Sequence, residues 1–383
     1  MSAIDELAAD LRAARVQRIH VLAWRDLDDP DAGGSEVHAD EVLRRWAAAG
    51  LDVVLRTSAA GELPARSERH GYDVIRRGSR YTVFPRAGFA EVFGRMGRSD
   101  ALVEVWNGVP WFSPVWYRRP RVTIVHHVHG PMWDQMMPQP LAAMGRALEA
   151  RIAPVVYRHG ATVTPSESTR EELLELGFDA RRVTAVPNGV EERFTPGGER
   201  SPTPLVLAVG RFAPVKRFHL ALRAAALARR EVPDLRLRLV GDGPLAGELR
   251  TWVTEHRASE WVEFAGYVER DELRNEYRRA WVVLSASLAE GWGLSLTEAA
   301  ACATPAVATD IRGHRCSVVD GKTGLLAAPE RLGGALATVL ADEALRGRLG
   351  SAAATRARTL TWERTATGVL EVLLGEARRH HVG

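Results

Sequence analysis

Short β-branched and aliphatic runs alternate with longer helical patterns along the whole chain, and the series occurs twice. Such alternation is typical of parallel sheets covered by helices. The first series predicts strands at residues 18–23, 52–56, 72–76, 101–106, 121–126, 161–164 and 183–186. The second series predicts strands at residues 204–212, 235–243, 261–268, 281–287, 305–310 and 324–329. The chain is therefore predicted to be an α/β protein built from two doubly wound units.

Helices are predicted between these strands, for example at residues 35–49 and 141–158. The second of these is expected to kink at Pro154, because proline removes one helical hydrogen bond.

A polar segment rich in proline and glycine separates the two series. Residues 187–204 contain four prolines and three glycines, which is typical of a linker. The predicted boundaries are a first domain at 1–195, a linker at 196–204, a second domain at 205–360 and a C-terminal segment at 361–383. One large fused domain stays open as the alternative. Ligands of open parallel sheets bind beyond the carboxyl ends of the strands, so two domains placed face to face would form a deep cleft between them.

The composition is that of an ordinary folded protein, with 26% charged and 46% apolar residues. The formal net charge of +3 is small for 383 residues and does not indicate a nucleic-acid-binding protein. Two cysteines, Cys302 and Cys316, are too few for a disulfide framework, so a cytoplasmic location is predicted. No apolar run approaches the roughly 18 residues that cross a membrane. The N-terminus predicts an amphipathic helix rather than a targeting peptide, so any membrane contact is expected to be peripheral.

Two carboxylates fall at the end of one strand in SLAEGWGLSLTEAAACATP, residues 287–305. Glu290 is predicted to lie in the loop, and Glu298 in the first turns of a helix that begins near Leu294. A carboxylate can accept hydrogen bonds from adjacent hydroxyls of a sugar. Glycines in the loop and free N–H groups at the helix start can receive phosphate oxygens. A solvated loop acid and a carboxylate that favours the helix dipole are the alternatives.

Only two of the 51 basic residues are lysines, Lys216 and Lys322. Lys216 and Arg211 lie in VGRFAPVKRFHL, in the loop that follows the first strand of the second series. Two cations at this position suit a diphosphate, since arginine offers a planar fork and lysine a compact charge. An ordinary solvated loop is the alternative. Lys322 lies in DGKTG, which lacks the earlier glycine of a phosphate-binding loop and predicts a plain turn.

A glycine pair, Gly33 and Gly34, follows the first strand in DDPDAGGSEVH. The pair would let the backbone approach a phosphate or a sugar, with Ser35 as the helix N-cap and His38 near the helix start. A plain turn that needs glycine for its geometry is the alternative. The segment is not a GxGxxG fingerprint and lacks the acid that marks a dinucleotide ribose, which weakens an NAD interpretation.

Three histidines, His126, His127 and His129, follow a first-half strand in VTIVHHVHGPMW. Alternate residues of a strand face the same side, so His127 and His129 can share a face while His126 points away. No carboxylate or cysteine lies nearby at a usual ligand spacing. A polar contact from one histidine is therefore predicted, rather than a metal site.

Together these motifs resemble the nucleotide-sugar-dependent, retaining glycosyltransferases of the GT-B fold (glycosyltransferase family 4, group 1). The resemblance rests on GGSEVH, PNGV, VGRFAPVKR, LVGDGP, VEFAGYV and above all EGWGLSLTEA, with TWERTATGVLEVL as the closing helix. It runs from about residue 18 to about residue 374. It implies two Rossmann-like domains across a cleft, with residues 361–383 packing back on the first domain.

The resemblance also implies residue roles. Glu290 would hold hydroxyls of the donor sugar, Glu298 the ribose hydroxyls, and Arg211 with Lys216 the leaving diphosphate. His129 would contact the donor sugar, with His127 as the second candidate. The remaining residues expected to line the donor are Gly33, Gly34, Gly210, Tyr267, Gly291, Trp292, Gly293, Leu294 and Ser295.

The mechanism that the resemblance implies is retention without a metal ion or other cofactor, by attack on the face from which the diphosphate leaves. A non-catalytic nucleotide-sugar-binding protein and an NAD-dependent oxidoreductase stay open as alternatives. A pyridoxal-dependent phosphorylase would need a Schiff-base lysine, and neither lysine has a convincing context.

Residues 56–151 carry 14 arginines against 8 acids. In the fold of this family the first domain binds the acceptor, so a basic rim is expected there, made of Arg80, Tyr81 and Trp133 with Arg86, Arg95 and Arg98. This pattern favours a phosphorylated or otherwise anionic hydroxyl acceptor, a lipid-linked one included, or an anionic membrane surface. An ordinary solvated face is the alternative. Neither the base nor the sugar of the donor follows from the sequence.

Overall fold

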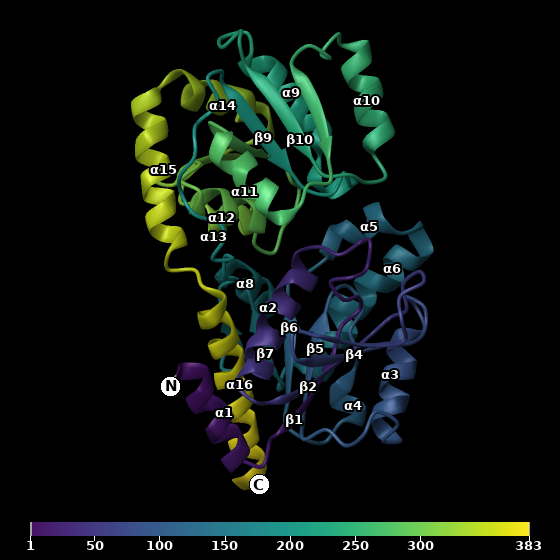
Figure 1. Ribbon diagram of the computed structural model, residues 1–383. Coiled ribbons are helices and arrows are strands. Elements are labelled where there is room, and N and C mark those ends of the chain that lie inside the picture. The colour runs from purple at the N-terminus through teal and green to yellow at the C-terminus, as the bar shows by residue number, and fades with distance from the viewer. Residues whose placement is uncertain (1, 383) are drawn as a thin grey trace. The chain divides into compact units, whose positions relative to one another are not determined.

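A computed structural model describes residues 2–382, and Met1 and Gly383 lie outside the described residues. The chain forms two compact units, one from residues up to Gly189 together with those from Trp362 onward, the other from Val190–Thr361. Each unit contains one sheet of mostly parallel strands with helices packed on it (Figure 1). The α/β class with two parallel sheets, predicted from the alternation of strand and helix patterns, is confirmed.

The sheet of the first unit has eight strands in the order β3-β4-β2-β1-β5-β6-β7-β8. All neighbouring pairs are parallel except β3 and β4, which form an antiparallel edge. The strands are β1 (Arg18–Leu22), β2 (Asp52–Thr57), β3 (Arg66–Arg69), β4 (Tyr72–Arg76), β5 (Ala101–Trp106), β6 (Arg121–Val125), β7 (Ala161–Thr164) and β8 (Val183–Ala185).

Helices and short helical turns connect these strands. They are α1 (Ala3–Ala13), α2 (Gly34–Ala48), α3 (Val83–Val92), α4 (Ser113–Trp116), η1 (Gly130–Met132), α5 (Trp133–Met136), α6 (Gln139–Ala147), the π-helical segment η2 (Leu148–Ile152), α7 (Ala153–Tyr157), α8 (Glu167–Glu175) and α16 (Trp362–Val382).

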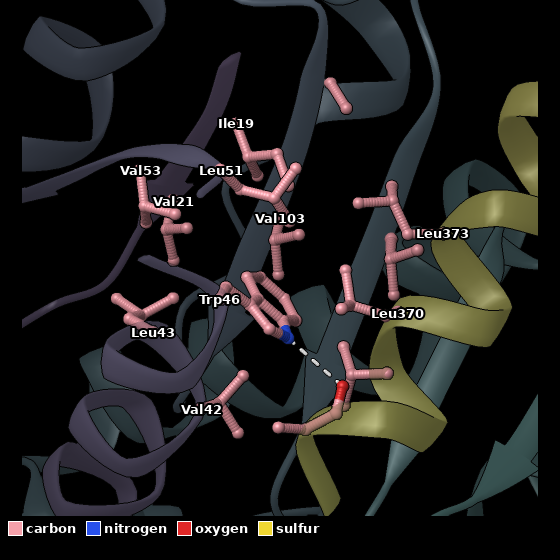
Figure 2. Packing of buried hydrophobic residues seen from close by; sticks show 14 of the residues in the cluster. Ile19, Val21, Val42, Leu43, Trp46, Leu51, Val53, Val103, Leu370 and Leu373 are labelled. Carbon is pink, nitrogen blue, oxygen red and sulfur yellow. Dashed lines mark hydrogen bonds between the residues drawn. The ribbon is translucent and has the colours of Figure 1, made fainter. Parts of the chain in front are cut away.

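The largest core of the first unit lies between the sheet and the helices α1, α2 and α16. Trp46 of α2 is fully buried in it, and its Nε1 donates to the carbonyl oxygen of Ala366 at 3.1 Å (Figure 2). Leu370 and Leu373 of α16 point into the same cluster. The last helix of the chain therefore completes the core of the first unit rather than of the unit that precedes it in sequence.

The sheet of the second unit has six strands, all parallel, in the order β11-β10-β9-β12-β13-β14. The strands are β9 (Leu205–Val209), β10 (Arg236–Val240), β11 (Val262–Gly266), β12 (Val282–Ser285), β13 (Ala306–Thr309) and β14 (Gly324–Ala327). The helical segments are η3 (Pro214–Lys216), α9 (Phe218–Ala228), α10 (Ala246–Glu255), α11 (Arg270–Arg279), α12 (Leu294–Ala301), α13 (Arg312–Ser317), η4 (Pro329–Arg331), α14 (Leu332–Ala341) and α15 (Glu343–Ala357).

Two apolar clusters fill the second unit, because its parallel strands are buried on both faces. Val206, Leu237 and Val282 point to one cluster, whereas Leu207 and Val283 point to the other. This alternation along each strand leaves the strand ends, rather than the faces of the sheet, accessible for a site.

Three local expectations need correction. β3 was not predicted, because RSER carries no apolar residue and the strand is an exposed edge. Ser35 is not the N-cap of α2: the helix begins at Gly34 after Gly33, whose N–H is bound by the Glu36 carboxylate at 2.7 Å. The helix predicted at residues 141–158 begins at Gln139 and is interrupted by the π-helical segment η2 just before Pro154.

Candidate active site

The carboxyl ends of β9 and β12 bring Lys216 and Glu290 together in the second unit. The strands are neighbours, and the loop after β9 carries Lys216 while the loop after β12 carries Glu290. Lys216 Nζ lies 2.5 Å from Glu290 Oε1, which also accepts from Ser287 Oγ at 2.8 Å. Glu290 Oε2 has no hydrogen-bond partner among the described residues. One oxygen of this carboxylate is thus fixed, and the other is open to a ligand hydroxyl.

Arg217, the residue after Lys216, joins the same two loops. Its backbone is left-handed, with φ of 47°, and its guanidinium donates to the carbonyl oxygens of Ala286 at 2.8 Å and Ser287 at 2.9 Å. Leu288 N also donates to the carbonyl oxygen of Val215 at 2.8 Å. The position of Lys216 relative to Glu290 is therefore set by backbone contacts as well as by charge.

The loop of Glu290 lies directly against the backbone of Gly313. A Cβ placed on Gly313 would lie 2.0 Å from the Glu290 carbonyl oxygen, so any side chain there would displace the loop. The next residue, His314, is fully buried. Its Nδ1 donates to the Thr309 carbonyl oxygen at 2.7 Å, and its Nε2 is hydrogen-bonded to Ser285 Oγ at 3.1 Å. Helix α13 thus packs against the Glu290 loop through Gly313.

Electrostatics keep Glu290 ionised although it is partly buried. Burial raises the pKa of its carboxyl, but the charges of Lys216 and His314 and the hydrogen bonds from Lys216 and Ser287 outweigh burial, and the net shift is downward. Burial lowers the pKa of His314 despite the nearby carboxylate. The Glu290 carboxyl is therefore ionised at neutral pH, beside the Lys216 ammonium group.

The N-terminus of α12 follows Glu290 after three residues. Gly293 caps it in a left-handed conformation with φ of 92°, which favours glycine. The accessible residues Leu294 and Ser295 form its first turn, where backbone N–H groups have no acceptor within the helix. Trp292 is buried, and its Nε1 has no hydrogen-bond partner. The predicted donor residues of this motif thus form one contiguous turn beside Glu290.

Glu298 is buried in α12 and already paired. Its Oε1 accepts from Arg270 Nη2 at 2.8 Å and its Oε2 from the Tyr277 hydroxyl at 2.9 Å. Arg270 also pairs with Glu191. Each carboxylate oxygen can accept a second hydrogen bond, so this pairing leaves capacity for a hydroxyl and rigidly orients the group.

The other predicted donor residues of the second unit lie at strand ends. Gly210 follows β9 with φ of 149°, and its carbonyl oxygen lies so close to Gly241 that a Cβ there would approach it to 2.1 Å. Arg211 is exposed next to it. Tyr267 follows β11 and is 75% exposed. These residues line the same carboxyl edge as Lys216.

In the first unit the Gly33 loop follows β1. Gly33 is extended, with φ of −143°, so glycine is not required there by backbone conformation, and a Cβ would lie 3.6 Å from the nearest atom. Arg25 bonds the carbonyl oxygen of Asp31 at 2.7 Å and pairs with Glu36. The loop is held by charged side chains, and its plain-turn interpretation is not supported by its geometry.

The three histidines separate as predicted, although they follow β6 rather than lie within it. His127 and His129 stack with ring centroids 4.3 Å apart, whereas His126 packs edge-on against His38 at 4.7 Å. Burial lowers the pKa of His38 to about 4 and the pKa values of His126 and His129 well below their usual range. These three rings are therefore neutral at pH 7.

Glu149, which the sequence did not single out, positions His129. Its carboxylate accepts from the backbone N–H groups of His129 and Gly130, both at 2.7 Å, and from Trp133 Nε1 at 3.3 Å. Burial raises the pKa of Glu149 against these hydrogen bonds, which lower it. The residue lies in the π-helical segment η2. That irregular turn therefore serves to present the carboxylate to the histidine loop.

The residues expected to form an acceptor rim differ in exposure and in their partners. Arg80 pairs with Asp29 at 3.2 Å and Asp31 at 2.5 Å, and Tyr81 is 75% exposed. Trp133 is not on a rim: it is 6% exposed and packs on Gly145 and His129. Its aromatic side chain belongs to the support of the histidine loop.

Residues 2–382 contain no group of three or more histidine, cysteine, aspartate or glutamate side chains arranged to hold a metal ion. Within the same residues, no helix is both long and apolar enough to cross a membrane.

Sequence comparison shows the family of the chain. Residues 190–356 match the family described as glycosyl transferases group 1, and residues 32–194 match glycosyltransferase family 4. D-inositol 3-phosphate glycosyltransferase of Frankia alni is 31% identical over 387 residues, covering 89% of this chain and 94% of that protein. The chain belongs to the family of group 1 and family 4 glycosyltransferases. The resemblance stated from the motifs is thereby confirmed, and the protein is a glycosyltransferase.

Solved structures of the same fold confirm the architecture of this glycosyltransferase. Sucrose-phosphate synthase from Thermosynechococcus elongatus has a TM-score of 0.81 at 22% identity, covering 96% of this chain and 99% of that chain. Anabaena HepE in complex with UDP-glucose has a TM-score of 0.72 at 18% identity, covering 92% and 98%. The fold is the GT-B fold of glycosyltransferases.

Several supporting residues were not found from the sequence. Gly313 and Glu149 act through backbone approach and hydrogen bonds to residues 16 or more positions away. Arg270 and Tyr277 reach Glu298 from α11.

We expect Gly313→Ala to lower transfer activity about 100-fold, because a displacement of about 1 Å at a catalytic group can have an effect of this size. The added methyl group would meet the Glu290 backbone and shift the Lys216–Glu290 pair. Gly334→Ala in α14 is the matched control, since a Cβ there meets nothing within 4 Å. Steady-state kinetics of both variants, with thermal unfolding in parallel, measure the effect. Full activity of Gly313→Ala would show that this contact does not set the site.

The neutral buried histidines predict that stability falls at acidic pH. The folded-state pKa of His38, about 4, lies below that of an exposed histidine, so the unfolded chain binds the proton first. Stability is therefore lost as the pH falls from about 6.5 toward 4, by about 1.4 kcal/mol per pH unit for one such group. Urea denaturation at several pH values gives the slope of the unfolding free energy against pH. This slope should fall in His38→Gln by the amount that corresponds to about one proton, whereas replacement of an exposed histidine, His159→Gln, should leave it unchanged. Equal slopes for the wild type and His38→Gln would contradict the assignment.

Proposed function

We propose that this glycosyltransferase moves a sugar from a nucleotide diphosphate sugar to an acceptor hydroxyl, with retention of anomeric configuration and without a metal ion. The observation that carries the proposal is the Lys216–Glu290 pair beside the N-terminus of α12. It places a cation, a carboxylate with one oxygen available to a ligand, and backbone N–H donors at the carboxyl edge of one sheet. This is the combination that a sugar attached to a diphosphate requires.

The diphosphate would bind where positive charge gathers. Lys216 and Arg211 carry full charges, and the first turn of α12 adds the positive end of the helix dipole. As the bond between the anomeric carbon and the diphosphate oxygen breaks, negative charge grows on that oxygen. Groups placed in advance to receive this charge lower the barrier more than they strengthen substrate binding.

The donor sugar would lie against Glu290. Its Oε2 would accept from sugar hydroxyls, while Oε1 stays bound to Lys216 and Ser287. The same carboxylate thereby couples the sugar position to the cation at the phosphate. Glu298, oriented by Arg270 and Tyr277, would accept from the ribose hydroxyls.

The proton and electron balance needs no further group. The acceptor oxygen bonds to the anomeric carbon on the face that the diphosphate leaves, and the leaving phosphate oxygen takes the acceptor proton. In the first unit, neutral His129, held by Glu149, would hydrogen-bond the donor sugar without adding charge, with His127 stacked on it. Gly33 and Gly34 would approach the diphosphate.

The nucleotide base is proposed to be uracil as a first test, since HepE is a neighbour in fold and was solved with UDP-glucose. A panel of nucleotide sugars scored by thermal stabilisation would identify the donor, because a ligand that binds only the folded protein raises its stability. Transfer or hydrolysis of the stabilising donor separates an enzyme from a non-catalytic nucleotide-sugar-binding protein.

We expect Lys216→Ala to lower kcat about 100- to 1000-fold, the usual effect of removing one group that stabilises transition-state charge. KM for the donor should change less. Lys322→Ala removes the only other lysine, in an exposed turn, and should leave kcat unchanged. Steady-state kinetics with the identified donor decide this. An unchanged kcat in Lys216→Ala would remove Lys216 from the diphosphate site.

Retention predicts that the anomeric configuration of the new glycosidic bond equals that of the donor. NMR of the product formed in the presence of EDTA tests configuration and metal dependence together. An inverted product would overturn the same-face mechanism. Loss of activity in EDTA, restored by a divalent cation, would overturn metal independence.

A further inference from the structure

A cavity of about 650 Å³ lies in the first unit between α3 and the strands β2 and β4. Six of its lining residues are arginines: Arg56, Arg66, Arg76, Arg77, Arg86 and Arg95. Most of the rest are apolar, Phe89 and Met96 among them. The volume is in the range of pockets that hold small molecules. No residue of the proposed donor site lines it.

Positive charge in this cavity is not balanced by the protein. Arg76 pairs with Asp26 at 2.7 Å and with Asp28 at 2.8 Å, so its charge is neutralised. The other five arginines have no acidic partner among residues 2–382. No acidic side chain lines the cavity either.

Arg56 places a charge at the most buried point. The side chain is 2% exposed and donates only to backbone carbonyls, to Arg77 at 2.6 Å and to Ile75 at 3.4 Å as well as to Thr57. Burial and the charges of Arg77 and Arg86 lower its pKa to about 10. The group therefore stays protonated at neutral pH, and a buried charge without a counterion is a costly arrangement that an anionic ligand would relieve.

We propose that this cavity is a second anion site, which binds the phosphate group of a small phosphomonoester or of a phospholipid headgroup. Arginine is suited to such a ligand, because its planar fork bonds two phosphate oxygens at once. Arg77 and Arg86 are exposed at the cavity and can reorient toward a ligand, while Arg56 forms a fixed charge behind them. The apolar wall around Phe89 would contact the body of the ligand.

The residues that line the anion site are not those proposed to hold the donor, although the Gly33 loop follows β1, the strand next to β2. The cavity borders β2, and His129 follows β6, three strands further along the sheet. At about 4.8 Å per strand this is roughly 14 Å, too far for one phosphate to serve both places. Lys216 and Arg211 belong to the other unit. The inference therefore does not rest on the proposed function.

Calorimetric titration of the full chain with glycerol 3-phosphate, and with glycerol as its uncharged parent, tests the site. We expect binding of the phosphate ester only. Arg77→Gln and Arg86→Gln should each weaken it about tenfold, the effect of losing one charge-assisted hydrogen bond. Both side chains are exposed, so the variants should fold. Arg118→Gln, an exposed arginine outside the cavity, should bind as the wild type does.

Vesicles of phosphatidylglycerol, compared with phosphatidylcholine, separate the two sources of phosphate. Binding to phosphatidylglycerol vesicles alone, lost in the two cavity variants, assigns the site to a headgroup. Binding of soluble glycerol 3-phosphate assigns it to a free ester. Absence of both, or binding that the two variants leave unchanged, would overturn the proposal. UDP binding followed in parallel reports on the proposed function independently.

Discussion

Parallel pairing of the strands is the constraint on which both units depend. Because neighbouring strands run in one direction, their carboxyl ends and following loops meet at one edge of each sheet. Lys216 after β9 and Glu290 after β12 are 74 residues apart in sequence and 2.5 Å apart in space for this reason. The sheet faces are filled by apolar clusters, which leaves the edge for polar chemistry. The glycines at these edges, Gly210 and Gly313 among them, let adjacent loops approach closely enough to share hydrogen bonds.

Buried ionisable side chains occur in three different electrostatic environments in this protein. Glu290 and Glu298 are each paired with a cation, which orients both carboxylates. Burial keeps His38, His126 and His129 neutral instead, although His129 lies 3.8 Å from the Glu149 carboxylate. Arg56 can do neither, because a guanidinium does not lose its proton near neutral pH and no acid faces it. Glu290, Glu298 and His129 are proposed to contact the donor, and Arg56 marks a place where a ligand would supply the missing charge.

Much of the fold followed from local patterns. The alternation of strand and helix predicted nearly every strand, since buried parallel strands are short apolar runs bounded by glycine and proline. It failed at β3, whose polar residues pair only at an exposed edge, and at η2, where the helix widens before Pro154. The candidate site was predicted at Lys216, Glu290 and the start of α12 because these residues sit at strand ends, which a sequence reveals. Glu149, Gly313 and Arg270 were missed because each acts on a residue of another element.

By itself the sequence determined the class of fold, the family and the residues that carry charge at the strand ends, because these depend on periodicity and on residue type. Only the tertiary structure decided which charges are balanced. The sequence predicted a basic rim that included Arg86 and Arg95. Only the packing of α3 beside β2 and β4 brings them around one cavity with Arg56, Arg66, Arg76 and Arg77. Likewise, Trp133 was expected on an acceptor rim, but its ring packs on Gly145 in the interior. Charge compensation and burial are properties of neighbours in space, and the order of residues along the chain does not contain them.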